Sequence, residues 1–391
     1  MRCTQEFEKM YGREPDGTTF CPYRVCPLGA HTDHQHGIVT GFAIDKGIHI
    51  AYGAKQNGVI EITSLQFQKR AQFHANAVPK ERQYDWADYL RGAVVALSEK
   101  HHISTGLCCV IDGSLPIGGL SSSATVIIAF LAALCKVNNI TLTENEMIMT
   151  ALKAENEYVG VSCGKLDQSC EVHSQKDHLL YLDTLDDTYE LIPTNPKMKP
   201  YEIAIFFSGV ERNLAGSKYN MRVDECRSAA YALKAHAGME YGKFAETYLR
   251  DVPFEVFEQY KDKLPQTWRM RAQHWYAETD RVKRGVQAWR EGDLETFGRL
   301  SFESGRSSIE QWQTGSEELK ALYEIALNTD GVYGGRFSGA GFKGCSMALI
   351  DPAYKEKIQE TVTREYLKRF PVLADKFSVH FCHSADGVKL K

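Results

Sequence analysis

The segment LPIGGLSSSATVIIAFLAAL, which runs from Leu115 to Leu134, places a glycine turn directly before the longest apolar run of the chain. That run, Ala124–Cys135, is too short to span a bilayer and predicts a buried helix. Glycines let a backbone come close to a ligand, and free N–H groups at a helix start attract anions. Three serines add hydroxyl groups suited to phosphate or magnesium. The segment predicts a phosphate-binding loop without the Walker pattern, and a capped core helix is the structural alternative.

Strand-like and helix-like patterns alternate on both sides of this loop. The sequence predicts strands over 38–52, with a turn at Asp45–Gly47, and over 58–67. It predicts helices over 85–100, 122–136 and 143–160, the last with a capping box of Thr143 and Glu146. The second half predicts a strand from residue 201, long helices between 220 and 326, and a strand at CSMALI, followed by a helix and a last strand. Proline and lysine near residue 198 mark a boundary between two expected domains, 1–198 and 199–391.

The composition is that of an ordinary soluble globular protein, with 43% hydrophobic and 25% charged residues. A net charge of -4 gives no reason to expect a nucleic-acid or anionic-membrane partner. The N-terminal sequence MRCTQEFEKMYGREP lacks the apolar core of a signal peptide. The 11 cysteines include no C-x-x-C pair, which indicates reduced thiols, and we expect a cytoplasmic protein.

A second glycine-rich segment, GGRFSGAGFKGCSMALI, contains a literal G-x-G-x-x-G at residues 339–344. A dinucleotide-binding fingerprint requires a strand before these glycines and a helix after them. A strand-like segment follows here instead, so the pattern predicts a flexible loop that touches a ligand or makes a turn.

The stretch PLGAHTDHQHG places His31, Asp33, His34 and His36 within six positions. Such a cluster suits a metal site, and it also suits a sugar pocket, where hydroxyl groups need donors and acceptors side by side. The other tight histidine pairs, 101–102 and 380–383, have no carboxylate pattern beside them. We therefore interpret the stretch as part of a sugar pocket.

Five segments together resemble the GHMP small-molecule kinases, and most closely the galactokinase branch. They occur in the family order and span nearly the whole chain. YRVCPLGAHTDHQHG is similar to the sugar signature, and LPIGGLSSSA to the phosphate loop in a form one residue shorter than in many members. The other three are KAENEYVGVSCGKLDQS, GSKYNMRVDEC and the glycine-rich GGRFSGAGFKGC.

The resemblance implies an α+β protein with the GHMP kinase fold. Its N-terminal domain would be an S5-like α/β domain with a five-stranded sheet, and its C-terminal domain would be ferredoxin-like. The active site would lie between the two. ATP and Mg²⁺ are the implied cofactors, and a small-molecule sugar is the implied partner.

Residue roles follow from the same resemblance. Asp167 matches the carboxylate placed against the anomeric hydroxyl, and Arg24 matches the arginine near that carboxylate and the γ-phosphate. Ser123 and Glu155 match the Mg²⁺ ligands. The ATP phosphates would be held by Gly118, Gly119, Leu120, Ser121, Ser122 and Ser123, and the sugar would contact Ala30, His31, Asp33, Gly164 and Tyr219.

Each of these residues also has a purely structural interpretation. Arg24 could form a surface ion pair, and Asp167 could cap a helix after a glycine turn. Glu155 could lie on a solvated helix face, and Tyr219 could be half-buried packing. His34 matches no family contact, so we expect it to be exposed or to serve in packing, and we expect the same of His36.

The sugar signature departs from the galactokinase pattern at three positions. Cys26 replaces the usual asparagine, Ala30 the usual glutamate, and His34 the usual tyrosine. The glutamate faces the 6-hydroxyl in galactokinases, and two like charges about 4 Å apart cost about 4 kcal/mol at an effective dielectric of 20. An alanine therefore admits a 6-carboxylate that a glutamate would reject, and Lys165 and Arg222 are candidate cations for it.

This form of the signature resembles the galacturonate kinase branch, so D-galacturonate is the expected substrate, phosphorylated at the 1-hydroxyl. D-galactose, L-arabinose and L-fucose remain alternatives. A non-catalytic sugar-binding regulator is a further alternative, but it would be expected to have lost Asp167, Arg24 or the serine loop, and all three are present. Cys26 is expected to be a packing residue.

Overall fold

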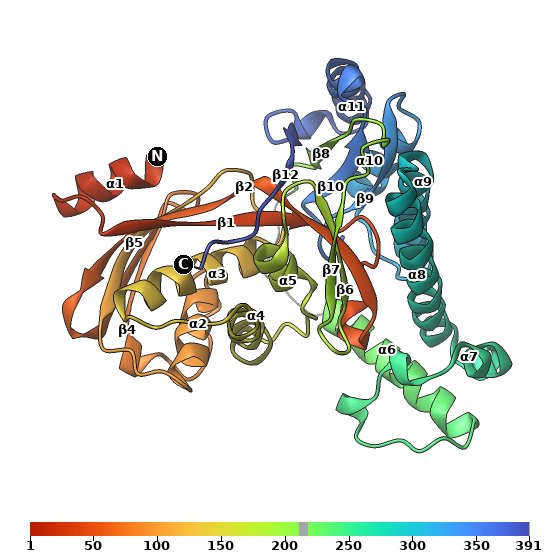
Figure 1. Cartoon of the computed structure of the whole chain (residues 1–391), viewed down its shortest axis with the longest axis horizontal. Coiled ribbons are helices and arrows are strands. Elements are labelled where there is room, and N and C mark those ends of the chain that lie inside the picture. The colour runs from red at the N-terminus through yellow and green to blue at the C-terminus, as the bar shows by residue number, and fades with distance from the viewer. Residues whose placement is uncertain (211–217, 391) are drawn as a thin grey trace.

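The computed structural model describes residues 1–210 and 218–390, which form two units, each built around its own sheet (Figure 1). The elements of the first unit are α1 (Arg2–Tyr11), β1 (Gly17–Val25), β2 (Ile38–Lys55), β3 (Val59–Ser64), β4 (Lys69–His74), α2 (Asp88–Ser98), β5 (Gly106–Gly113), α3 (Ser122–Val137), α4 (Glu144–Lys153), α5 (Leu166–His173), β6 (His178–Asp183) and β7 (Tyr189–Pro193). The boundary that we expect at residue 198 lies between β7 and the first strand of the second unit.

The second unit holds most of the remaining chain. Its elements are β8 (Glu202–Phe207), α6 (Lys218–His236), α7 (Phe254–Tyr260), α8 (Gln266–Glu291), α9 (Leu294–Glu310), α10 (Glu317–Leu327), β9 (Val332–Phe337), β10 (Cys345–Ile350), α11 (Lys355–Arg369) and β11 (Ser378–Cys382). The last strand, β12 (Ser384–Ala385), belongs to the first sheet. Within the described residues, no helix is both long enough and apolar enough to cross a membrane.

Strand β2 is the spine of the first sheet. The sheet has eight strands, with β4-β3-β5-β2-β6-β7 as its main path and with β1 and β12 also paired to β2. The beginning of β2, residues 38–41, pairs with β6, and its end, residues 48–55, pairs with β5. Its 18 residues span about 60 Å. This length lets β2 pair with four other strands, so the sheet has eight strands and not the expected five.

The turn expected at Asp45–Gly47 is wrong, because β2 continues through these residues as one strand. Gly47 is explained by a close approach instead. A Cβ atom there would come within 2.1 Å of the Cys21 carbonyl oxygen on the paired strand β1. Glycine is therefore needed here because two backbones approach closely. A turn would also favour glycine, so the two causes look alike in the sequence.

The apolar run beginning at Ala124 forms α3, as predicted, and α3 is buried under the first sheet. Side chains of β5 alternate between the two faces of the sheet, as the pleat requires. Leu107, Cys109 and Ile111 belong to the core that contains α2 and α3, whereas Cys108 and Val110 pack against α1 on the other face. Thr143 and Glu146 form the predicted capping box at the start of α4.

The second sheet has the antiparallel order β11-β8-β10-β9 and is buried on both faces. Ala204 and Phe206 of β8 pack in the core under α10 and α11, whereas Ile203, Ile205 and Phe207 join the core of the first unit. Four antiparallel strands with two helices on one face confirm the α+β architecture. The other face of the sheet packs against the first unit.

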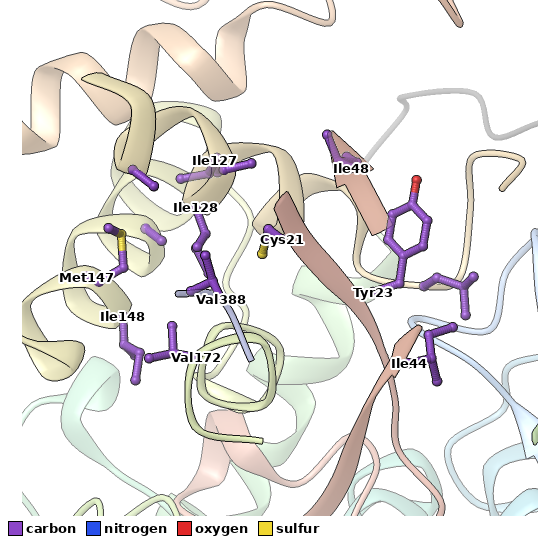
Figure 2. Close-up of a cluster of buried hydrophobic side chains, with 14 of the residues drawn as sticks. Cys21, Tyr23, Ile44, Ile48, Ile127, Ile128, Met147, Ile148, Val172 and Val388 are labelled. Atoms are coloured by element: carbon purple, nitrogen blue, oxygen red, sulfur yellow. The ribbon is translucent and has the colours of Figure 1, made fainter. Parts of the chain in front are cut away.

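The end of the chain returns to the first unit. Strand β12 pairs with Ala43 and Ile44 of β2, and Val388 beyond it is buried with Ile128 of α3 and Val172 of α5 (Figure 2). The C-terminal tail therefore ties the second unit to the first one.

Candidate active site

Asp167 lies in the first turn of α5 and bonds to two residues of the proposed site. The Arg24 Nε donates to its Oδ1 over 2.7 Å, and the Ser121 hydroxyl donates to its Oδ2 over 2.7 Å. Arg24 is only 3% exposed and comes from β1. Burial opposes its charge, but the Asp167 carboxylate outweighs burial and raises the pKa of Arg24. The arrangement is an ion pair between a buried arginine and a partly exposed carboxylate, and it does not fit the alternatives of a surface ion pair or a simple helix cap.

The predicted phosphate loop turns tightly in front of α3. Gly118 and Gly119 have φ angles of 127° and 86°, and Ser121 has a φ of 63°, all in the left-handed region. The Gly119 carbonyl accepts a bond of 3.2 Å from the Arg24 guanidinium, so the loop lies beside the ion pair. The Ser122 hydroxyl is buried and has no hydrogen-bond partner in the described structure.

The two glycine-rich loops of the sequence pack against each other. A Cβ atom on Gly339 would come within 3.0 Å of the Gly119 Cα, and one on Gly344 within 2.7 Å of the Gly118 carbonyl carbon. The strand β10 follows Gly344 directly, so the rejection of a dinucleotide-binding fingerprint is confirmed. The second loop therefore forms one wall of the phosphate loop.

Glu155 lies in a π-helical turn, Ala154–Val159, that continues α4. Turns of this kind are frequent at functional sites. The carboxylate is 4% exposed and accepts a bond of 2.5 Å from Gln168, the residue after Asp167. Glu155 is thus buried beside the ion pair and does not lie on a solvated face. Ser123 is half-buried in the first turn of α3.

Asp33 connects the sugar signature to the start of α5. Its Oδ2 accepts a bond of 3.2 Å from the Leu166 N–H, and a Cβ on Gly164 would come within 2.5 Å of its Cγ. Burial, with a further contribution from the Asp167 carboxylate, raises the pKa of Asp33 to about 6. Glycine at position 164 is therefore what allows Asp33 to lie next to Asp167.

His31 lies in a cluster of buried rings. It stacks on Trp312 with 5.1 Å between ring centroids, and Tyr219 meets Trp312 edge-on at 6.3 Å. The His31 Nε2 and the Trp312 Nε1 are buried without partners among the described residues. Burial holds the pKa of His31 well below its usual range, so the ring is neutral. Tyr219 is described, but Gly216 and Ser217 of its sequence segment lie outside the described residues.

His34 packs in the same cluster, with its ring 5.4 Å from that of Trp312, which agrees with a packing role. The His36 ring lies 4.0 Å from the ring of Tyr248. Across residues 1–210 and 218–390, no group of three His, Cys, Asp or Glu side chains is placed to hold a metal ion.

Ala30 contributes its backbone rather than a polar side chain. Its methyl group is buried with Leu166 and Cys26, and the pKa of the Cys26 thiol is raised by burial to about 12, which fits a packing cysteine. Neither candidate cation is free. Lys165 forms an ion pair with Asp187, and Arg222 donates to the carbonyls of residues 218, 312 and 313.

Sequence reasoning missed three buried residues of the second unit that contact the sugar signature. These are His274 and Glu278 of α8 and Trp312 after α9. No local spacing marks them, since each lies more than 200 positions from residues 29–31. The feature that distinguishes Glu278 is that it is a charged residue buried in an amphipathic helix. Burial depends on tertiary packing, so the sequence does not reveal this feature.

Comparisons with known proteins cover nearly the whole chain. Family models match at residues 5–54 (galactokinase galactose-binding signature), 88–175 (GHMP kinases N terminal domain) and 286–368 (GHMP kinases C terminal). The chain is 37% identical to a galacturonokinase of Arabidopsis thaliana, over 94% of this chain and 92% of that protein. It is 31% identical to a galactokinase of Roseiflexus sp. (strain RS-1), over 98% and 95%.

Among solved structures, that of Lactococcus lactis galactokinase complexed with galactose is similar, with a TM-score of 0.89 at 27% identity. The similarity covers 99% of this chain and 98% of that one. The chain therefore belongs to the GHMP kinase family, and it is a sugar kinase of the galactokinase branch.

Proposed function

We propose that this kinase transfers the γ-phosphoryl group of ATP to the 1-hydroxyl of D-galacturonate. The observation that carries the proposal is Ala30, which replaces the glutamate that galactokinases direct toward the 6-hydroxyl. The 37% identity to a galacturonokinase supports the same substrate.

The geometry supports a division of roles around Asp167. The sugar 1-hydroxyl oxygen attacks the γ-phosphorus and releases ADP, while the hydroxyl proton passes to the Asp167 carboxylate. Arg24 fixes that carboxylate and provides positive charge for the transferring phosphoryl group. The Arg24–Asp167 bond holds both side chains in place, so little reorganisation is needed during the reaction.

The glycine and serine loop, residues 118–123, would hold the ATP phosphates. Its tight turns bring backbone close to the ligand, and the unpartnered Ser122 hydroxyl is available as a donor. Ser123 and Glu155 would supply the hydroxyl and carboxylate oxygens that Mg²⁺ prefers. When bound, Mg²⁺ would neutralise phosphate charge.

Selectivity for a carboxylate would come from the ring cluster beside Ala30. Lys165 and Arg222 are engaged elsewhere, so the proposal does not depend on a new ion pair. The unpartnered His31 and Trp312 ring nitrogens provide neutral hydrogen-bonding groups. Because position 30 is an alanine, no acidic side chain there repels the 6-carboxylate. Asp33 and Tyr219 would contact the ring hydroxyl groups, as the signature implies.

The first test is ADP release with ATP and Mg²⁺ for D-galacturonate, D-galactose, D-glucuronate, L-arabinose and L-fucose, each supplied alone. The proposal predicts that kcat/KM is highest for D-galacturonate. A higher value for D-galactose would overturn the assignment of the substrate, although the chain would still be a sugar kinase.

Ala30→Glu tests the charge argument directly. Repulsion between the glutamate and the 6-carboxylate costs up to about 4 kcal/mol at an effective dielectric of 20. The value of kcat/KM for galacturonate should therefore fall about a hundredfold or more. Ala30→Gln has nearly the same size without the charge and serves as the matched control. If both variants lose activity equally, volume and not charge is responsible, and the charge argument is wrong.

D-galactose is the second candidate substrate. The observations that favour it are the match to the galactose-binding signature and the similarity to a galactokinase solved with galactose. The panel above separates the two candidates.

A further inference from the structure

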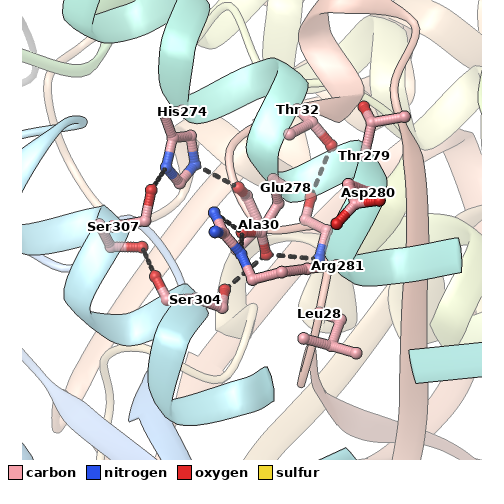
Figure 3. A network of polar contacts seen from close by, with 12 residues as sticks. Leu28, Ala30, Thr32, His274, Glu278, Thr279, Asp280, Arg281, Ser304 and Ser307 are labelled. Carbon is pink, nitrogen blue, oxygen red and sulfur yellow. Dashed lines mark hydrogen bonds and ion pairs between the residues drawn. The ribbon is translucent and has the colours of Figure 1, made fainter. Parts of the chain in front are cut away.

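Side chains of helix α8 in the second unit form hydrogen bonds with backbone groups of the sugar signature (Figure 3). The Gly29 N–H donates to the Glu278 Oε1 over 2.8 Å, and the His274 Nε2 lies 3.0 Å from the Ala30 carbonyl oxygen. Residues 274 and 278 are one helical turn apart, so both face the same turn. Two consecutive peptide groups beside the proposed sugar contacts are therefore fixed from the other unit.

The Glu278 carboxylate is itself anchored on every side. Arg281 donates to its Oε2 over 2.7 Å, Ser304 donates to its Oε1 over 2.5 Å, and Arg336 lies 3.6 Å from Oε1. The Glu278 side chain is fully buried. Burial alone would raise the pKa of Glu278, but Arg281 and other positive neighbours lower it to about 2. The acceptor for Gly29 is thus a buried carboxylate that stays ionised.

His274 is fixed in one tautomer. Burial lowers its pKa to about 4, so the ring is neutral, and the Ala30 carbonyl can only accept. The proton therefore lies on Nε2, and Nδ1 accepts from the Ser307 hydroxyl 2.8 Å away. Ser307 lies on α9, so two helices of the second unit orient this ring.

The backbone that these bonds hold has a positive φ angle at two positions. Gly29 has a φ of 94° and His31 a φ of 64°, and a histidine in the left-handed region is held there only when its surroundings impose it. The bonds to Gly29 and Ala30, together with the stack of Trp312 on His31, supply that constraint.

We propose that His274 and Glu278 are positioning residues for sugar binding, which hold Gly29 and Ala30 so that His31 and Asp33 meet the sugar. This inference rests on the proposed role of residues 30–33 as sugar contacts. It does not depend on which sugar is the substrate, because the bonds act on the backbone.

The experiment compares His274→Phe, which keeps a ring but removes both nitrogens, with His274→Gln, which restores a donor. KM for the sugar should rise about fivefold or more in His274→Phe and return to within twofold of wild type in His274→Gln, the loss expected for one buried hydrogen bond. KM for ATP should stay within twofold in both. Ser307→Ala should shift the sugar KM in the same direction by a smaller factor.

Glu278→Gln keeps an oxygen for Gly29 but removes the charge, and it should raise the sugar KM at least as much as His274→Phe. Arg284→Ala, on an exposed part of α8, is the matched control and should change neither KM. The proposal is overturned if folded variants keep the wild-type sugar KM, or if the KM for ATP rises as much as that for the sugar.

Each variant is assayed with galacturonate and with galactose, and a similar shift for both is expected. A wild-type preference for galactose would overturn the substrate proposal while leaving this one standing. If His274→Phe does not fold, Ser307→Ala decides the outcome, and an unchanged sugar KM there contradicts the inference.

Discussion

At one end of the candidate site the Asp167 carboxylate meets Arg24 and Ser121, and at the other end the His31 ring meets Trp312. The first end is charged, and these three residues all come from the first unit, although the glycine-rich loop of the second unit packs beside them. The second end consists of neutral rings and is built across both units. The difference suggests that the carboxylate and arginine proposed for phosphoryl transfer are fixed within one unit, whereas the groups proposed for sugar selection depend on how the two units pack.

The largest expected effect breaks the charged end. Asp167→Asn keeps the shape of the side chain but removes the proton acceptor, so kcat should fall about a thousandfold. The measurement is single-turnover phosphorylation at saturating ATP and sugar.

Thermal unfolding of the same variant is the control, because the buried Arg24 loses its counter-charge and some loss of stability is expected. A folded variant whose kcat stays within tenfold of wild type would show that Asp167 is not the catalytic carboxylate.

A smaller effect is expected where the charged end touches the second unit. Gly119→Ala forces a left-handed residue and brings a Cβ to 2.7 Å from the Cys345 Sγ. Strain and overpacking of about 2 kcal/mol should raise KM for ATP about thirtyfold. Gly12→Ala, at another left-handed glycine with open space around it, is the matched control and should leave KM for ATP unchanged. An unchanged KM for ATP in Gly119→Ala would contradict the close packing of the two glycine loops.

Asp33 lies between the two ends, and its ionisation should make kcat/KM for the sugar depend on pH. Burial and the Asp167 carboxylate raise the pKa of Asp33 to about 6, so this acceptor is ionised above that pH and protonated below it. If Asp33 must be ionised to accept sugar hydroxyl groups, kcat/KM for the sugar should fall about tenfold between pH 7 and pH 5. Initial rates at low sugar concentration measure this dependence.

Stability should respond to the same group with the opposite sign. The pKa of Asp33 is higher in the folded protein than in the unfolded chain, so its protonated form favours folding. Its contribution is present below about pH 4 and is lost as the pH rises through about 6. Asp33→Asn should remove this slope from the free energy of unfolding, and an identical slope in both proteins would assign the titration to another group.

The smallest expected effect sharpens the neutral end. Trp312→Phe keeps an aromatic ring against His31 but removes the indole N–H, which has no partner among the described residues. KM for the sugar should rise about fivefold if this group binds the substrate, with KM for ATP unchanged. An unchanged sugar KM would contradict a role of the indole N–H in sugar binding.

Local patterns predicted the fold well where neighbours in the sequence decide the structure. The apolar run after Ser123 forms α3, the Thr143 capping box forms, and CSMALI is the strand β10. The turn at Asp45–Gly47 failed for a specific reason. Gly47 is required by the approach of β1, and a single glycine cannot reveal whether it bends a strand or admits another.

The site shows the same division. The motifs indicated that Arg24, Asp167 and the serine loop belong to one site, and the structure brings them into contact. They did not indicate that the chain ends on the first sheet, where β12 pairs with β2. Nor did they reveal that both candidate cations are already occupied, because ion pairs form between residues that only folding brings together.

By itself, the sequence determined the elements, the order of the motifs and the absence of a glutamate at position 30. These depend on hydrogen bonds and side-chain periodicity within a few residues, or on residue identity alone. Only the tertiary structure decided that His274 meets Ala30 across 244 positions and that Trp312 stacks on His31. Such contacts come from the packing of two cores, and packing is a property of the whole chain rather than of any segment.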